Sequence, residues 1–250
     1  MRFLVAIPVF NESRYVERVV QDVRAHVPHV LVVDDGSTDE TPEILDRMTG
    51  IPIIRHPENR GYGQSLIDAF RWADRRGYDW IITIDCDDQH EPAGIPAFVD
   101  RAVADDADVI SGSRYREVLP GSTDAPQDRR SINRRITKLL NCVLGLSLTD
   151  GFCGFKAYRV AAISSLRLTI PGYAFPMQFW TQAAVHDLRI CEIPVPLIYN
   201  DPTRHFGGVL DDPASRYRHY LEVFQSELQC AGRFDGSHAA CVEAALAGEA

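Results

Sequence analysis

The sequence predicts an α/β fold: a single domain with a mostly parallel sheet flanked by helices. Strand-like apolar runs alternate with amphipathic helical segments through the first half of the chain, at the spacing of βαβ units. Several runs end in Asp, Asn or Gly, which is typical of loops at the carboxyl edge of such a sheet. At 250 residues and 45% hydrophobic, the chain could build one large domain or two small ones, and we predict one.

Each element follows from a local pattern. Strands are expected at six apolar runs: 3–8, 30–33, 51–54, 80–84, 107–111 and 188–193. Helices are expected where apolar residues recur at helical spacing: 13–27, 41–48, 65–75, 131–144, 157–166, 175–186 and 212–228. Residues 115–128 are rich in Gly, Pro, Ser and Asp and predict a long loop, which is often functional. The Ala-rich tail 231–250 is expected to be poorly ordered.

Charge and composition restrict the partners. The formal net charge of −9 would repel a polyanion, so no nucleic-acid partner is expected. Five basic residues nevertheless fall within ten positions: Arg129, Arg130, Arg134, Arg135 and Lys138. The six cysteines show no CxxC pair, which favours free thiols in a reducing compartment. Neither a signal peptide nor a run of roughly 20 apolar residues is visible. We therefore expect a cytoplasmic protein whose membrane contact is at most peripheral.

The most informative segment is Asp85-Cys86-Asp87-Asp88-Gln89-His90, directly after the predicted strand 80–84. In extended chain, Asp85, Asp87 and Gln89 point to one side, at the sheet edge where α/β proteins bind ligands. Hard oxygen ligands suit Mg²⁺ or Mn²⁺, which in turn can hold a diphosphate. An acidic loop that caps a helix starting near Glu91-Pro92 is the alternative interpretation.

Three further segments follow predicted strands or lead into a helix at the same edge. They are Pro8-Val9-Phe10-Asn11-Glu12, Val33-Asp34-Asp35-Gly36-Ser37-Thr38-Asp39 and Asn59-Arg60-Gly61. Turn chemistry alone explains each of them, because Asp-Gly and Asn-x-Gly favour tight turns. Their convergence on one sheet edge favours a shared ligand site.

With these segments in this order, the chain resembles the family 2 glycosyltransferases of GT-A fold, a Rossmann-like fold. It is most similar to the dolichol-phosphate and polyprenol-phosphate sugar synthases. Further matching segments are Gly112-Ser113-Arg114-Tyr115, Asp150-Gly151-Phe152-Cys153-Gly154-Phe155 and Glu192-Ile193-Pro194. The resemblance implies an inverting, metal-dependent transfer of a hexose from a GDP-mannose or UDP-glucose type donor to a polyprenyl or dolichyl phosphate. It also implies that 1–113 form the nucleotide-sugar half and 114–230 the acceptor half of the domain 1–230.

The resemblance assigns donor-site roles residue by residue. The residues expected to contact the nucleotide sugar are Pro8, Phe10, Glu12, Val33, Asp35, Asp85, Cys86 and Arg204. Asp35 would bind the base or ribose, while Asp85, Asp87 and Gln89 would hold Mg²⁺ or Mn²⁺ with the diphosphate. Such a metal offsets the charge that develops on the departing nucleoside diphosphate.

On the acceptor side, the resemblance makes Asp87, Arg114 and Arg130 the catalytic candidates. An Arg after Gly-Ser and a later Arg hold the acceptor phosphate in the family. Here these are Arg114 and either Arg130 or Arg129. Their hydroxyl partner would be Ser131 or Thr137, although the family spacing lands on Asn133 or Arg134. The family's Ser-Lys after Arg204 is replaced by Gly208-Val209, and Lys156 is the candidate substitute.

Two alternatives remain open. One keeps the donor chemistry but uses a soluble or glycolipid hydroxyl, which needs a general base, whereas a phosphate needs only positioning and charge compensation. The stretch Phe175–Gln178, where hydroxyl-glycosylating members place an acid, has no carboxylate. The other alternative is a non-catalytic nucleotide-sugar-binding subunit, against which the intact Asp85 and Asp87 argue. A dehydrogenase is excluded because no GxGxxG follows the first strand.

Overall fold

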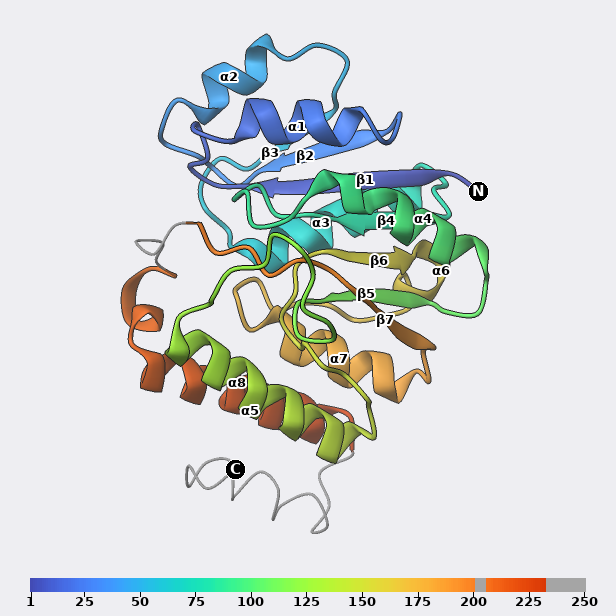
Figure 1. Cartoon of the computed structure of the whole chain (residues 1–250), viewed down its shortest axis with the longest axis vertical. Coiled ribbons are helices and arrows are strands. Elements are labelled where there is room, and N and C mark those ends of the chain that lie inside the picture. Colours follow the sequence, from blue (N-terminus) through green and yellow to red (C-terminus); the bar gives the residue numbers. More distant parts are fainter. Residues whose placement is uncertain (201–205, 233–250) are drawn as a thin grey trace.

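The computed structural model describes residues 1–200 and 206–232 and places seven strands in one sheet (Figure 1). The strands are β1 (Phe3–Val9), β2 (Val30–Asp34), β3 (Ile53–Arg55), β4 (Trp80–Thr83), β5 (Val109–Ser113), β6 (Lys156–Arg159) and β7 (Ile190–Pro194). Their order is β3-β2-β1-β4-β6-β5-β7. Neighbours pair in parallel, except that β6 runs antiparallel to both β4 and β5. The sheet is therefore mostly parallel.

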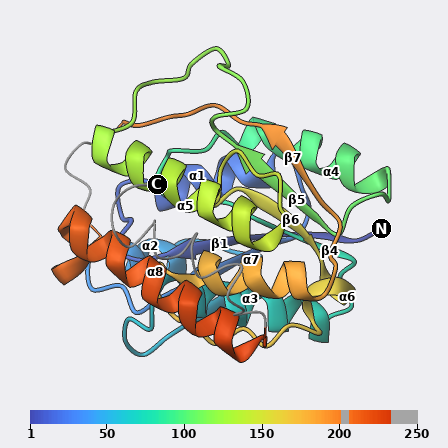
Figure 2. The same ribbon diagram turned by 90° about the horizontal axis from the view of Figure 1, so that it is seen from below.

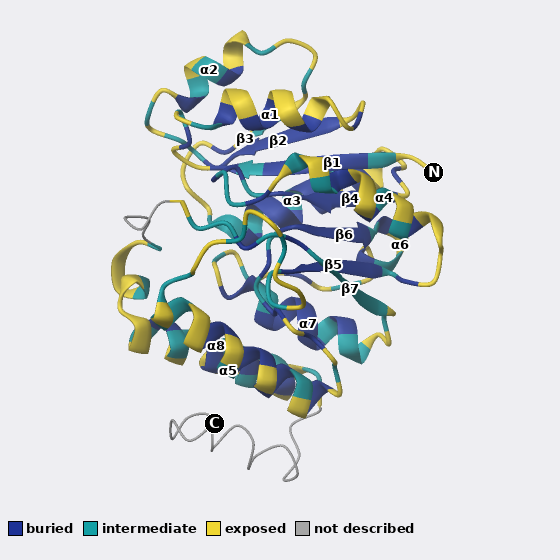
Figure 3. Ribbon diagram, in the orientation of Figure 1, coloured by how far each residue is buried: buried dark blue, intermediate teal, exposed yellow. Residues whose placement is uncertain are grey.

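Helices cover both faces of this sheet. They are α1 (Val16–Arg24), α2 (Thr41–Arg47), α3 (Tyr62–Arg75), α4 (Ile95–Val103), α5 (Gln127–Leu144), α6 (Val160–Ile163), α7 (Phe175–Val185) and α8 (Pro213–Cys230), with short turns η1 (Pro92–Gly94) and η2 (Gly208–Asp211). One apolar core joins α1 and α4 to the sheet, and a second joins α3, α5, α7 and α8 to the opposite face. The inner strands β1, β2, β4, β5 and β6 are mostly buried between these layers, whereas the edge strands β3 and β7 are only partly buried (Figure 3).

Strand periodicity explains the two cores. Leu4 and Ala6 of β1 belong to the core under α3, while Val5 and Ile7 belong to the core under α1. Successive side chains of a strand point to opposite faces, so an unbroken apolar run marks a strand that is covered on both sides. The prediction of a single α/β domain with a mostly parallel sheet between helices is confirmed.

The predicted helix 157–166 is wrong. Residues 156–159 form the central antiparallel strand β6, and only Val160–Ile163 are helical. Lys156, Ala157 and Tyr158 are buried because β6 lies between β4 and β5. A strand covered on both faces shows no alternation of polar and apolar residues, so the tertiary pairing decides its structure.

Helix α4 is not among the predicted helices, and the other differences are at element boundaries. Helix α5 begins at Gln127 rather than 131, α3 begins at Tyr62 rather than 65, and α1 begins at Val16. Of the predicted tail, residues 233–250 lie outside the described part of the chain. No helix in 1–200 or 206–232 combines the length and the hydropathy that a membrane span requires.

Candidate active site

A cavity of about 390 Å³ opens where the carboxyl ends of the parallel strands face α5, α7 and α8. The strand-end segments at β1, β2 and β4 supply one side of it: Pro8, Val9, Phe10, Glu12, Asp35, Asp85, Cys86, Asp87 and Gln89. The opposite side comes from residues after β5 and includes Arg114, Tyr115, Arg129, Ile132, Asn133, Phe152, Tyr173, Pro176, Tyr199, Phe206, Arg216 and Tyr220. In Figure 1 the carboxyl end of β1 and the first turn of α5 both lie at the left of the molecule.

Charge is divided sharply between the two sides of this cavity. Its four carboxylates, Glu12, Asp35, Asp85 and Asp87, all come from the first 113 residues. Its three arginines, Arg114, Arg129 and Arg216, all come from later segments. Among the described residues, no carboxylate lines the later side, whose other members are aromatic, apolar or uncharged polar. The two sides therefore suit different chemical groups.

The Asp35 carboxylate is buried and fixed by the turn that precedes α3. It accepts hydrogen bonds from the backbone N–H of Arg60 at 2.9 Å and of Gly61 at 2.8 Å. His56 Nδ1 lies 2.6 Å from the same carboxylate. Gly36 is required beside it, because a Cβ there would come within 2.3 Å of the Glu58 carbonyl carbon. The end of β2 and the turn 56–61 thus form one preorganised wall.

The loops after β1 and β2 are also bound to each other. Asn11 adopts a left-handed φ of 56°, and its side-chain oxygen accepts the Thr38 N–H at 2.8 Å. Glu12 donates its N–H to Thr41 Oγ1 at 2.9 Å. These bonds hold Phe10 and Glu12 at the cavity, so the first two matching segments act as one structural unit.

Asp85 and Asp87 lie beside each other in the cavity wall. Asp85 Oδ1 accepts the Tyr62 hydroxyl at 2.9 Å, and Oδ2 lies 3.6 Å from His90 Nε2. Burial, followed by the charge of Asp85, raises the pKa of Tyr62 well above its ordinary value, so the phenol remains a donor. Asp87 accepts the Gln89 N–H at 3.1 Å.

Asp88 points away from this pair. It has a left-handed φ of 60°, and its carboxylate pairs with Arg18 at 2.5 Å. Asp88 therefore lies on the other side of the segment from Asp85 and Asp87.

The two carboxylates fit a divalent cation whose remaining ligands would come from the substrate. No group of three or more His, Cys, Asp or Glu side chains in the described ranges is arranged to hold a metal. Magnesium is commonly held by one or two carboxylates together with substrate phosphates, rather than by a cage made only of protein ligands. Asp85 and Asp87, with the Gln89 side chain beside them, provide that partial set of oxygen ligands.

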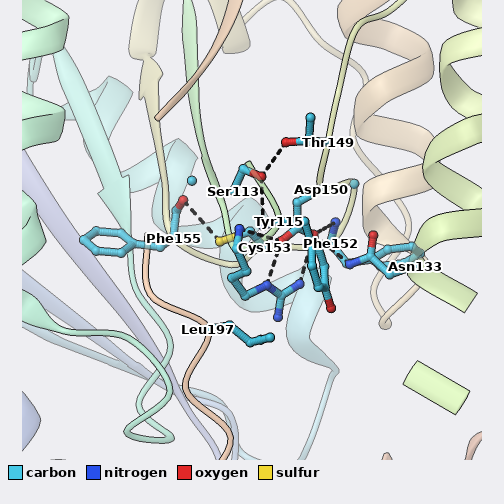
Figure 4. Close-up of polar contacts among 12 residues, drawn as sticks. Ser113, Tyr115, Asn133, Thr149, Asp150, Phe152, Cys153, Phe155 and Leu197 are labelled. Carbon is cyan, nitrogen blue, oxygen red and sulfur yellow. Dashed lines mark hydrogen bonds and ion pairs between the residues drawn. The ribbon is translucent and has the colours of Figure 1, made fainter. Parts of the chain in front are cut away.

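Arg114 is held by Asp150 in a bidentate ion pair. Arg114 Nε lies 2.7 Å and Nη2 lies 3.0 Å from the two carboxylate oxygens, and the Arg114 N–H is a third donor at 3.2 Å. Burial disfavours both charges, but their mutual attraction prevails: the pKa of Asp150 is lowered and that of Arg114 is raised. Asn133 donates to the same carboxylate at 2.7 Å (Figure 4). The guanidinium is therefore a fixed, permanent positive charge.

A second layer of hydrogen bonds fixes Asp150 itself. Glu192 accepts the backbone N–H groups of Thr149 at 2.9 Å and of Asp150 at 3.1 Å. Ser113 and Thr149 join their hydroxyls at 2.5 Å, as Figure 4 shows. Ser113, at the end of β5, and Glu192, in β7, thereby hold the loop that carries Asp150.

Cys153 is not a reactive thiol. Burial raises its pKa to about 12, so it stays protonated at neutral pH. Lys156 donates to the Cys153 carbonyl oxygen from a buried position in β6. Lys156, the predicted substitute for the missing lysine at the diphosphate, does not line the cavity, and its Nζ lies 5.5 Å from the centre of the Trp180 ring.

Arg129 and Arg216 hold Phe206 between them. Their guanidinium carbons lie 4.6 Å and 4.4 Å from the centre of the Phe206 ring. Arg216, which is buried, also pairs with Asp128 at 2.7 Å and donates to the Leu210 carbonyl at 2.9 Å. These contacts join the first turns of α5 and α8 at the cavity.

Most predicted site residues meet at this cavity, with three exceptions. Pro8, Phe10, Glu12, Asp35, Asp85, Cys86, Asp87, Gln89 and Arg114 line it. Val33 faces the apolar core, because the alternation of β2 turns its side chain inward. Arg130 is exposed on α5, and Arg129 lines the cavity instead. Arg204 lies outside the described residues.

Sequence reasoning missed the residues that position others. The sequence assigns no role to Tyr62, Asp150 or Gly154, and it marks Asn133 only through the family spacing. Gly154 leaves the space that the Asp85 carboxylate occupies. Such contacts join segments far apart in the chain, so only the spacing of Asn133, four residues after Arg129 on one helix, was available as a signal.

The chain is similar in sequence and fold to several known proteins. The undecaprenyl-phosphate mannosyltransferase of Micrococcus luteus is 29% identical over 85% of this chain and 90% of its own. The polyprenol monophosphomannose synthase of Mycolicibacterium smegmatis is 30% identical over 78% and 76%. A crystal structure of Mycobacterium tuberculosis glucosyl-3-phosphoglycerate synthase with Mn²⁺, UDP-glucose and phosphoglyceric acid superposes with a TM-score of 0.69, at 20% identity, over 94% of this chain and 81% of that one. The family model described as glycosyl transferase family 2 matches residues 4–167, and the chain belongs to that family.

Proposed function

We propose that this glycosyltransferase moves a hexose from a nucleotide sugar to a polyprenyl phosphate, with inversion at the anomeric carbon. The donor is of the GDP-mannose or UDP-glucose type, and residues 1–113 bind it while residues 114–230 bind the acceptor. The names of two relatives support such an acceptor: one is an undecaprenyl-phosphate mannosyltransferase, and the other is a polyprenol monophosphomannose synthase.

The division of charge in the cavity carries this proposal. The acceptor side presents Arg114, Arg129 and Arg216 beside aromatic and apolar side chains. Arginines recognise phosphate oxygens, whereas Phe152, Ile132 and Tyr220 suit a hydrocarbon chain. An acceptor with an anionic head and an apolar tail matches both features.

On the donor side, Asp35, Phe10 and Glu12 would bind the nucleoside, and Asp85 and Asp87 would hold Mg²⁺ or Mn²⁺ with Gln89 beside them. Such an ion offsets the negative charge that develops on the leaving nucleoside diphosphate. Tyr62 and Gly154 fix the orientation of the Asp85 carboxylate, so the protein does not reorganise when that charge appears.

The acceptor side positions the nucleophile. A phosphate monoester is already anionic at neutral pH, so its oxygen attacks the anomeric carbon without a general base. Consistent with this, Pro176 lines the cavity at the start of α7, and no carboxylate stands there. Arg114, oriented by Asp150, and Arg129 would hold the phosphate in line with the bond that breaks.

The test is an assay of the purified chain with Mn²⁺ or Mg²⁺, a panel of UDP- and GDP-sugars and a polyprenyl phosphate, with products identified by mass spectrometry. The matched control acceptor is the polyprenol of the same length without phosphate. A prenyl-phosphate sugar of inverted configuration, lost on addition of EDTA and absent with the polyprenol, is the expected result.

Two results would contradict the proposal. Transfer to the polyprenol or to a soluble sugar hydroxyl, with no product on the phosphate, would assign the cavity to a hydroxyl acceptor. Tight, metal-dependent nucleotide-sugar binding with no transfer to any acceptor would make the chain a binding subunit.

A further inference from the structure

The outer face of α5 carries a basic stripe, which we define as Arg130, Arg134 and Lys138. These residues are spaced four apart, so they lie on one side of the helix over about 12 Å. All three are exposed, while Ile132, Ile136 and Leu140 on the other side of the helix belong to the apolar core. The stripe is therefore a solvent-facing surface and not a part of the packing.

No acid within the described ranges neutralises the basic stripe. Two other exposed arginines of this acidic chain do have carboxylate partners: Arg18 pairs with Asp88, and Arg189 pairs with Asp108 at 2.8 Å. For Arg130, Arg134 and Lys138, residues 1–200 and 206–232 supply no ion pair or side-chain hydrogen bond. In a protein of net charge −9, three positive charges thus stand in a row without an ion pair to any described residue.

The position of the stripe relates it to the cavity. Arg129, in the first turn of α5, lines the cavity, and the stripe starts at the next residue and runs away from the opening. Helices α5 and α8 pack side by side on the same end of the molecule (Figure 2). A flat surface that meets the outer face of α5 would consequently lie next to the acceptor side.

We propose that the basic stripe is a docking surface for an anionic lipid bilayer. Its charge complements acidic headgroups, and each Lys or Arg near such a surface contributes about 1 kcal/mol of attraction, or about fivefold in partition. The choice of a bilayer over another polyanion rests on the proposed function, because the acceptor phosphate would then be presented by the same membrane. The acidic remainder of the protein is screened beyond about 8–10 Å at physiological salt.

The test measures sedimentation of the protein with vesicles of phosphatidylcholine alone or mixed with phosphatidylglycerol. The variant is Arg134→Gln/Lys138→Gln, which leaves Arg129 and Arg130 intact. The matched control is Arg47→Gln/Arg75→Gln, which removes the same charge from exposed positions of α2 and α3. We expect the wild type and the control to bind only the anionic vesicles, more weakly at high salt, and the α5 variant to bind about 25-fold more weakly.

The proposal would be overturned if the α5 variant and the control bound the anionic vesicles equally well. It would also be overturned if the wild type did not bind anionic vesicles. Thermal unfolding must be unchanged in both variants.

An assay with prenyl phosphate in neutral detergent separates this proposal from the proposed function. Undiminished transfer by the α5 variant in detergent, with transfer lost on anionic vesicles, supports docking. A wild type without transfer in detergent contradicts the function, whatever the vesicles show.

Discussion

The Asp85 carboxylate occupies the space that a side chain at Gly154 would fill: a Cβ there would lie 2.0 Å from Asp85 Oδ2. Two segments about 70 residues apart in the chain are thus in contact at the candidate metal site. The glycine is needed for close approach and not for a left-handed backbone, because its φ lies outside that region.

Gly154→Ala should therefore displace Asp85 and lower kcat by about 100-fold or more, because misplacement of a reacting group by about 1 Å can cost that much. The matched control is Gly172→Ala, since nothing lies within 4 Å of a Cβ at Gly172. The measurements are transfer rate and Mn²⁺-dependent nucleotide binding. An alanine at 154 with wild-type rates would show that the position of Asp85 does not matter.

Asp87→Asn should reduce transfer by more than about 100-fold, since even changes next to a metal ligand commonly cost 10–100-fold. Asp88→Asn is the control, because Asp88 faces Arg18 outside the cavity. Rates at increasing Mn²⁺ concentration measure the effect. If both variants retained full activity, Asp87 would not be a metal ligand.

The Arg114–Asp150 pair predicts a stability that depends on pH. The pKa of Asp150 is lowered in the folded state, so its contribution is present above its unfolded pKa of about 3.9 and is lost as the pH falls below that value. Asp150→Asn leaves the Arg114 charge largely buried without its partner and should cost about 3–5 kcal/mol at pH 7.

Urea unfolding of the wild type and of Asp150→Asn from pH 7 to pH 3 checks this prediction. The difference between the two free energies of unfolding should shrink as the pH falls below about 4. A difference that stays constant would show that the carboxylate is not charged in the folded state.

Arg129 and Arg130 provide a direct comparison between the structure and the sequence-based choice. Arg129→Ala should raise the KM for the acceptor about 10- to 100-fold, the range for a charge-assisted hydrogen bond, and Arg129→Lys should recover part of it. Arg130→Ala should change the detergent-based KM by less than about threefold, because Arg130 is exposed outside the cavity. A larger rise in the acceptor KM for Arg130→Ala than for Arg129→Ala would instead identify Arg130 as the phosphate ligand.

Local sequence patterns were sufficient to predict the elements whose structure depends on residues close together in the chain. The apolar runs of β1, β2 and β4 predict buried parallel strands, and the carboxylates that follow them must meet at one edge. For this reason Asp35, Asp85 and Asp87 could be assigned to one sheet edge without a structure, whereas the role of Arg114 came from the resemblance to the glycosyltransferase family.

Only the tertiary structure decided what depends on contacts between distant segments. The burial of β6 between β4 and β5 makes a strand of residues that read as a helix. The start of α5 at Gln127 turns Arg129 rather than Arg130 toward the cavity, because one residue rotates a side chain by about 100° around a helix. Likewise, Asp150 pairs with Arg114, and Gly154 packs against Asp85, although the partners lie tens of residues apart in the chain. Local propensity does not encode such pairings. Packing and charge neutralisation in the folded chain determine them.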